Sequence, residues 1–362
     1  MPNRAEIIAE AQRLRARFEA QGAQVVQTPV LQSAETLLDL YGEDIRGRAY
    51  VTADPLHGEQ MLRPDFTVPV VQMHMAEGAE PARYTYSGAV FRRQEENPER
   101  DSEYLQVGYE VFDRADPAAC EAEVFTEISA TLEGLSLRAA TGDIGLLMAA
   151  VDGLETTERR KAALRRHIWR PRRFRALLDR FSGRAPVPAS RVSLLSADAP
   201  LAHDIPHVGL RSEGEISARI DALREDADAA PLSGGQVDLI DALLNVRETL
   251  PFALEQLRDI AVDLPSIQTA VNGVAARCDA LLARGVDVDA LEFEGSYGRT
   301  SMEYYDGFVF GLYAEGRPDL PPVATGGRYD ALTAALGSGA GIPAVGAVIR
   351  PGLVLRLREG RA

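Results

Sequence analysis

The sequence predicts an α+β fold in which an antiparallel sheet is flanked by helices. Two blocks of β-like runs, one before about residue 115 and one after residue 290, are separated by a long segment with helical periodicity. This order of elements is typical of a main domain that is divided by an insertion. The predicted parts are a first core part at 1–149, a mostly helical insertion at 150–265 and a second core part at 266–362.

The first block contains both helices and strands. Apolar residues recur at helical spacing over residues 3–21, and Gly22 follows as a stop. The segment VVQTPVLQ predicts a short strand at an edge, because Pro29 has no N–H to donate to a ladder. The further predicted elements are a helix at ETLLDLYGE, a hairpin of RAYVTAD and EQMLRPD, two strands at RYTYSGAVFRR and EYLQVGYEVFD joined by a flexible loop QEENPERDS, and a helix at 117–136.

The insertion and the second block differ in pattern. Residues 150–265 contain several amphipathic helical stretches, such as VDLIDALLNVRETL, and a Pro/Ala/Ser-rich stretch, SGRAPVPAS. Residues 290–362 return to β-like runs at EYYDGFVFGLYAE and PAVGAVIR, on either side of a turn-rich GGRYD. These runs complete the sheet that the first block begins.

Composition limits the class of protein. The 362 residues carry a formal net charge of −15, which argues against a protein whose main partner is nucleic acid. There is no run of 18 apolar residues, and the N-terminus alternates charged and apolar residues, so we expect a cytoplasmic protein that does not span a membrane. Cys120 and Cys278 share no metal-like spacing, and neither a disulfide, a metal site nor a cofactor is expected.

The two strands of the first block carry a polar constellation. Arg92 ends one strand, and Gln106 and Glu110 lie four residues apart on the next. Residues at even separation share a face of a strand, so Gln106, Gly108 and Glu110 line one side, and the glycine leaves room for a ligand. A buried carboxylate requires a cationic or hydrogen-bonding partner. The residues suit a zwitterionic ligand with a polar side chain, but taken alone they are also consistent with a surface ion-pair network.

Five segments of the chain resemble motifs of the class II aminoacyl-tRNA synthetases. VVQTPVL resembles motif 1, LRPDFT resembles LRPEGT, FRRQEENPERDSEYLQVGYE resembles motif 2, MEYYDGFVFGLY resembles LDYYTGTVFE, and ATGGRYDAL resembles AGGRYDGL. The likeness is to the histidyl-tRNA synthetase catalytic domain and, more closely, to its paralogues, the ATP phosphoribosyltransferase regulatory subunits. It covers most of residues 1–145 and 290–355 and implies a class II synthetase-like sheet.

The resemblance implies a histidine-binding site. By position, Asp65, Thr67 and Gln106 would meet the α-amino group, and Glu110 would receive the imidazole. A carboxylate and a tyrosine hydroxyl can read both nitrogens of a neutral imidazole. The implied histidine-binding residues are Asp65, Thr67, Arg92, Gln106, Glu110, Tyr304, Tyr305 and Tyr329.

Other positions depart from the synthetase pattern. Thr300 stands where synthetases carry an arginine that neutralises developing charge, with Arg299 one residue away. Leu353 stands where the adenine-packing arginine of motif 3 belongs, and Arg350 replaces a glycine. Pro351 is expected to interrupt the helix that follows. These departures indicate that the chain does not activate histidine with ATP, so no catalytic residue is assigned.

The resemblance therefore implies a non-catalytic regulatory subunit. Its partner would be the short catalytic subunit of ATP phosphoribosyltransferase, which needs this chain for activity and is inhibited when the chain binds L-histidine. The motif 1 likeness implies a homodimer within a larger hetero-oligomer, and the chain end leaves no room for an anticodon-binding domain. An active histidyl-tRNA synthetase, an RNA-linked histidine sensor and a synthetase-like amino-acid ligase remain open.

One basic segment stands out in the acidic chain. ERRKAALRRHIWRPRRFRALLDR, within residues 158–184, is rich in arginine and contains Trp169. It is consistent with a solvated helix face, with a protein interface or with a contact to nucleic acid.

Overall fold

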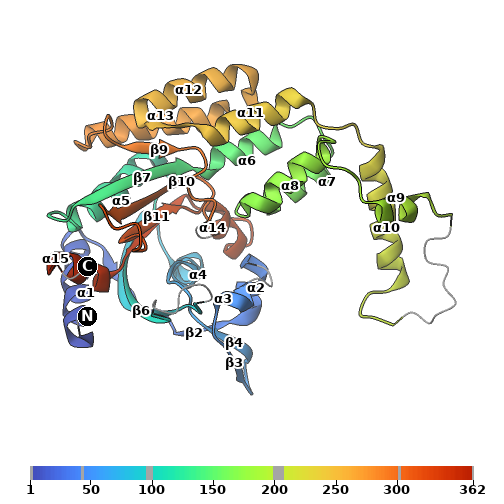
Figure 1. Ribbon diagram of the computed structural model, residues 1–362. Coiled ribbons are helices and arrows are strands. Elements are labelled where there is room, and N and C mark those ends of the chain that lie inside the picture. Colours follow the sequence, from blue (N-terminus) through green and yellow to red (C-terminus); the bar gives the residue numbers. More distant parts are fainter. Residues whose placement is uncertain (1–2, 42–44, 95–100, 199–207, 301–302, 361–362) are drawn as a thin grey trace.

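Most of the chain folds around one large sheet (Figure 1). The computed structural model describes residues 3–41, 45–94, 101–198, 208–300 and 303–360. Within these residues the sheet has nine strands, antiparallel except for the β1–β5 and β7–β9 pairs. Their order across the sheet is β1 (Gln24–Val25), β5 (Ala82–Phe91), β6 (Glu103–Phe112), β12 (Ala344–Ile349), β11 (Ala324–Arg328), β10 (Phe308–Ala314), β7 (Leu137–Asp143), β9 (Glu292–Glu294) and β8 (Arg247–Thr249).

The two faces of the sheet have different coverings. Tyr109 of β6 stacks on Phe18 at 5.0 Å between ring centroids and donates a hydrogen bond to Glu123, so this face packs against helices. The next residue, Glu110, points to the opposite face and meets Thr67. The first face is covered by α1 (Arg4–Ala20), α5 (Pro117–Thr131) and α15 (Pro351–Arg358), and the second by α4 (Thr67–Glu77) and α14 (Asp330–Leu336).

The remaining elements surround this core. A small antiparallel sheet contains β2 (Leu31–Ser33), β4 (Gly58–Leu62) and β3 (Val51–Asp54), and lies near α2 (Ala34–Tyr41) and α3 (Ile45–Arg48). Four helices lie beyond the β7 side of the large sheet (Figure 1): α6 (Ile144–Asp152), α11 (Gly234–Asn245), α12 (Leu250–Asp263) and α13 (Gln268–Ala283). No helix in the described ranges is long and apolar enough to cross a bilayer.

A helical arm extends away from the core (Figure 1). It consists of α7 (Glu158–Arg166), α8 (Pro171–Phe181), α9 (Ala189–Ser196) and α10 (Glu213–Asp228). Inside the arm, Asp226 accepts hydrogen bonds of 2.7 Å from Arg160 of the basic segment and from Arg191 of α9, so these two arginines hold the arm together. The domain boundaries at 149 and 266 stay a prediction; β8, which lies within 150–265, pairs with β9 of the large sheet.

The structure confirms the predicted helices at 3–21 and 117–136, the hairpin and the two long strands. Two local predictions are wrong. The Gly-Gly-Arg part of GGRYD is strand β11 and not a turn, because it pairs with β10 on one side and β12 on the other. Pro351 does not interrupt the following helix but begins it, since proline at the first helical position lacks only an N–H that has no partner there. Most of the predicted loop QEENPERDS lies outside the described residues.

Candidate functional site

A buried carboxylate is the centre of the predicted site. Glu110 is 1% exposed, and its carboxylate accepts three hydrogen bonds from hydroxyl groups. Tyr329 donates to Oε2 at 2.6 Å, while Tyr86 and Thr67 donate to Oε1 at 2.8 and 3.1 Å. Burial raises the pKa of Glu110 to about 7, although the three donors act to lower it. The site therefore holds an acid that changes charge near neutral pH.

A glycine on the neighbouring strand makes space for this carboxylate. Gly346 of β12 lies opposite Glu110 of β6 in the antiparallel register. A Cβ atom at Gly346 would overlap Oε2 of Glu110. Any larger residue would force the carboxylate away from the hydroxyl of Tyr329, so this glycine determines where the acid sits.

The space predicted above Gly108 does not exist. Tyr86 lies opposite Gly108 in the β5–β6 register, and a Cβ at Gly108 would overlap the Tyr86 ring. That ring is stacked on Phe66 at 4.3 Å, and the guanidinium of Arg63 lies 3.9 Å from the Phe66 centroid. The glycine therefore admits a tyrosine that holds Glu110, not a ligand. The sequence contained a signal for Tyr86, because pairing the two strands in register across their loop places it beside Glu110.

A second tyrosine pair continues the hydrogen-bond chain. Tyr304 donates to Oγ1 of Thr67 at 3.3 Å, and Thr67 donates onward to Glu110. The Tyr304 and Tyr305 rings meet edge to face, with centroids 4.8 Å apart. Burial raises the pKa of Tyr305 and Tyr329 well above the ordinary phenol value, so both hydroxyl groups stay protonated.

The two remaining predicted ligands of the α-amino group are also buried. Asp65 is 3% exposed, and its Oδ1 accepts a 3.4 Å hydrogen bond from the backbone N–H of Val68. Gln106 is 1% exposed, and its Oε1 has no hydrogen-bond partner in the part of the chain that the structure describes. A buried carbonyl without a donor is costly, so a ligand ammonium group at Gln106 would supply the missing partner.

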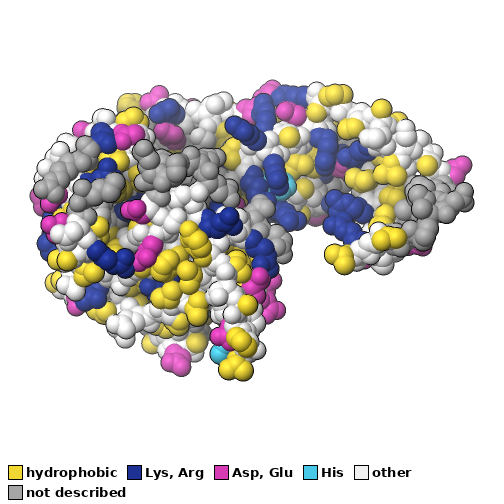
Figure 2. All heavy atoms as spheres, turned by 60° about the horizontal axis from the view of Figure 1, so that its bottom comes forward, with side chains coloured by type: hydrophobic (Ala, Val, Ile, Leu, Met, Phe, Trp, Pro, Cys, Tyr) yellow, Lys and Arg dark blue, Asp and Glu magenta, His cyan; other side chains and the backbone are white. Residues whose placement is uncertain are grey.

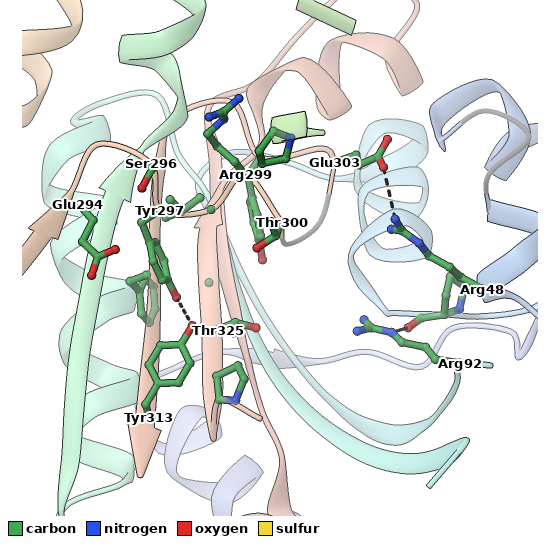
Figure 3. Close-up of a pocket in the computed structure, with 18 of the residues that line it drawn as sticks. Arg48, Arg92, Glu294, Ser296, Tyr297, Arg299, Thr300, Glu303, Tyr313 and Thr325 are labelled. Carbon is green, nitrogen blue, oxygen red and sulfur yellow. Dashed lines mark hydrogen bonds and ion pairs between the residues drawn. The ribbon is translucent and has the colours of Figure 1, made fainter. Parts of the chain in front are cut away.

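A cavity of about 730 Å³ lies beside this cluster (Figure 3). Arg92 and Tyr305 are the predicted residues that line it, and the Arg92 Nε donates to the Pro64 carbonyl at 2.7 Å. Tyr297 and Tyr313 form a 2.9 Å hydroxyl pair on another wall. The structure thus brings Thr67, Glu110, Tyr304 and Tyr329 into one hydrogen-bonded cluster, and Arg92 lies on the wall of the neighbouring cavity.

The structure places Arg350 beside the cavity, a position that sequence reasoning missed. Arg350 donates to the Pro322 carbonyl at 3.0 Å, and its guanidinium lies 5.6 Å from the Tyr104 ring centroid. The guanidinium of Arg92 lies 6.0 Å from the same centroid. The guanidinium groups of Arg92 and Arg350, from two different segments, therefore both lie near the Tyr104 ring, and both arginines line the cavity.

Arg299 is turned toward the arm. It is 6% exposed, its Nε donates to the Ile168 carbonyl at 2.9 Å, and its guanidinium lies 4.8 Å from the Phe174 centroid. Burial lowers the pKa of Arg299 to about 10. In Figure 3 its guanidinium points away from Tyr313 and Thr325, while Thr300 is exposed. Arg299 therefore joins the core to the arm, and it also lines the cavity.

Comparison with known proteins identifies the family. The profile described as "Histidyl-tRNA synthetase" matches residues 1–207 and 216–351. The chain belongs to this histidyl-tRNA synthetase family. The ATP phosphoribosyltransferase regulatory subunit of Brucella anthropi is 30% identical to it over 357 residues, which cover 92% of this chain and 93% of that protein. The corresponding protein of Brucella ovis is 29% identical over 354 residues, with 92% and 93% covered.

Solved structures confirm the class II synthetase-like fold. An ATP phosphoribosyltransferase regulatory subunit/histidyl-tRNA synthetase from Bacillus halodurans C matches with a TM-score of 0.68 at 20% identity, over 98% of this chain and 79% of that one. A histidine–tRNA ligase subunit from Alicyclobacillus acidocaldarius matches with a TM-score of 0.61 at 23% identity, over 100% and 95%. Among the residues that the structure describes, no three His, Cys, Asp or Glu side chains are grouped to hold a metal ion.

Proposed function

We propose that this chain is a regulatory subunit of ATP phosphoribosyltransferase that binds L-histidine and controls a separate catalytic subunit. The name of the regulatory subunits that match nearly the whole chain supports the assembly part of this proposal. The buried Glu110, with its three hydroxyl partners, supports the histidine part. The proposed catalytic partner condenses ATP with phosphoribosyl pyrophosphate.

The chemistry of the cluster fits a neutral imidazole. An imidazole N–H would donate to the Glu110 carboxylate, and a tyrosine hydroxyl would donate to the other ring nitrogen. The α-ammonium group would meet Asp65, Thr67 and the unpartnered Oε1 of Gln106. A ligand without matching donors would leave these buried groups unpaired, which is how such a site rejects other amino acids.

Regulation requires that histidine bind two states of the complex with different affinities. Tyr304 and Tyr305 lie in the segment that follows Arg299, and Arg299 contacts the arm through Ile168. A ligand that reorders the two tyrosines would therefore change a contact between the core and the arm. This connection is the physical route that we propose for the regulatory effect.

Reconstitution tests the proposal. Purified catalytic subunit, ATP and phosphoribosyl pyrophosphate are combined with and without this chain, and pyrophosphate release is measured against L-histidine concentration. We expect activity to depend on this chain and to fall with histidine, and Glu110→Ala to abolish the inhibition while leaving assembly intact. The exposed Glu255→Gln on α12 serves as the control. Absence of activation, or full histidine sensitivity in Glu110→Ala, would contradict the proposal; histidine-dependent ATP–pyrophosphate exchange by this chain alone would indicate a synthetase.

A further inference from the structure

The junction of α7 and α8 carries an unusual cluster of positive charge. Arg166 ends α7, and Arg172 and Arg173 lie in the first turn of α8; all three are exposed. Within the described residues none of the three has an acidic side chain within ion-pair distance, whereas Arg165, Arg175 and Arg184 nearby all have one. We name Arg166, Arg172 and Arg173 the arginine surface.

This cluster contradicts the charge preference of a helix start. The N-terminus of a helix is the positive end of its macrodipole and favours acidic residues. The other long arm helix follows this rule, because α10 begins with a Ser212–Glu215 capping box and carries Glu213 in its first turn. Helix α8 has no acid in its first turn, no side-chain cap and two arginines. A local electrostatic rule that is broken without a compensating contact marks a candidate functional surface.

The arginine surface adjoins the rim of the cavity. Pro171, next to Arg172, lines the cavity together with Arg48 and Glu303. Figure 2 shows Lys and Arg side chains gathered across the middle of the molecule, where the arm leaves the core. The chain as a whole has a net charge of −15, so this positive region has the opposite charge to the chain as a whole.

The same junction is held by the segment that carries the predicted imidazole site. Glu303, which precedes Tyr304, accepts from Arg170 at 3.3 Å and forms a 3.6 Å ion pair with Arg48. Earlier in the same segment, Arg299 donates to the carbonyl of Ile168. A partner that docks on the α7–α8 junction would therefore contact the part of the arm that is connected to Tyr304 and Tyr305.

We propose that the arginine surface docks an acidic patch of the catalytic subunit. This inference rests on the proposed function, because it names where the proposed partner binds. Arginine forms paired hydrogen bonds with carboxylates and is enriched at protein interfaces. A protein with an acidic patch fits better than RNA, since a long polyanion would also meet the acidic remainder of the chain.

The test is the double variant Arg172→Glu/Arg173→Glu. Glutamate suits the first turn of a helix, so the variant should fold with an unchanged or higher melting temperature. The control is Arg219→Glu/Arg258→Glu, which makes the same charge change at two exposed arginines of α10 and α12. Binding of immobilised wild type and variants to purified catalytic subunit is measured by biolayer interferometry at about 50, 150 and 500 mM NaCl, which spans strong to weak screening.

We expect the affinity of wild type for the catalytic subunit to fall as salt is raised. At the lowest salt, the affinity of Arg172→Glu/Arg173→Glu should be at least about tenfold lower than that of wild type, and the affinity of the control should stay within about twofold of wild type. Equal affinities of wild type and the double variant would overturn the docking surface and leave the proposed function standing. Failure of wild type to bind the catalytic subunit would overturn both. Binding of wild type and the double variant to a single-stranded RNA oligonucleotide is measured in the same way. If the double variant loses RNA binding but still binds the catalytic subunit like wild type, the surface is assigned to nucleic acid and the inference is overturned.

Discussion

Oε2 of Glu110 lies 2.6 Å from the hydroxyl of Tyr329, and both side chains are buried. The two residues are far apart in the sequence, on β6 and at the start of α14, and the turn after β11 brings them together. A short hydrogen bond to a carboxylate in a buried site is strong, but it does not fully offset the burial of a charge. The first two predictions below follow from this net cost of ionising Glu110 in the folded protein.

Glu110→Gln should stabilise the fold at high pH and abolish histidine binding. The folded pKa of Glu110, about 7, lies above the ordinary value, so the stability that its protonated form contributes is lost as pH rises toward 7 and beyond. Glutamine removes the cost of a buried charge, and we expect the melting temperature to rise by about 2 °C or more at pH 8 but little at pH 5. Thermal unfolding at both pH values measures this, and a larger destabilisation at pH 8 than at pH 5 would refute it.

Histidine affinity should fall as pH is lowered. A neutral imidazole needs an ionised Glu110, and both Glu110 and free histidine take up a proton between pH 8 and pH 6. Together these titrations should weaken binding by about 10- to 40-fold between those pH values, with net proton release on binding near pH 7. Isothermal titration at pH 6, 7 and 8 measures the affinity, and repeating it in two buffers of different ionisation enthalpy measures the protons released. An affinity that does not change with pH would show that Glu110 does not contact the ligand.

Gly346→Ala should damage the site, because the new methyl group would overlap the Glu110 carboxylate. We expect a loss of about 1–3 kcal/mol in the free energy of unfolding and a loss of histidine response. Gly273→Ala on α13 is the matched control, since its Cβ meets no atom within 4 Å; it should stabilise by up to about 1 kcal/mol. Adding Glu110→Ala to Gly346→Ala should restore stability but not histidine binding. Chemical denaturation of the wild type and the three variants measures these changes, and a Gly346→Ala protein as stable as the wild type would contradict the prediction.

Leu31→Asp should dissociate the proposed homodimer. Leu31 is 45% exposed and ends the segment that resembles the dimer-forming motif 1, and Tyr50, which is 39% exposed, lies on the other side of Leu62 in the small sheet. A charge buried at such an interface is unpaired and costly. Light scattering after size exclusion should show a monomer, while Leu282→Asp on α13, where the leucine is 52% exposed, should keep the wild-type mass. An unchanged mass for Leu31→Asp would remove this surface from the interface.

Local pattern and motif likeness by themselves determined the α+β fold, the order of its main elements and the eight candidate site residues. These features can be predicted from short-range periodicity and from motifs of a few residues, so predicting them does not require knowledge of contacts between distant segments. The tertiary structure alone decided that Tyr86 fills the space above Gly108, that Gly346 makes room for Glu110, and that GGR is a central strand. It also decided that Arg299 turns toward the arm and that a cavity lies beside Tyr305 and Arg92. Each of these depends on strand register or on packing between segments far apart in sequence, which a single sequence does not specify.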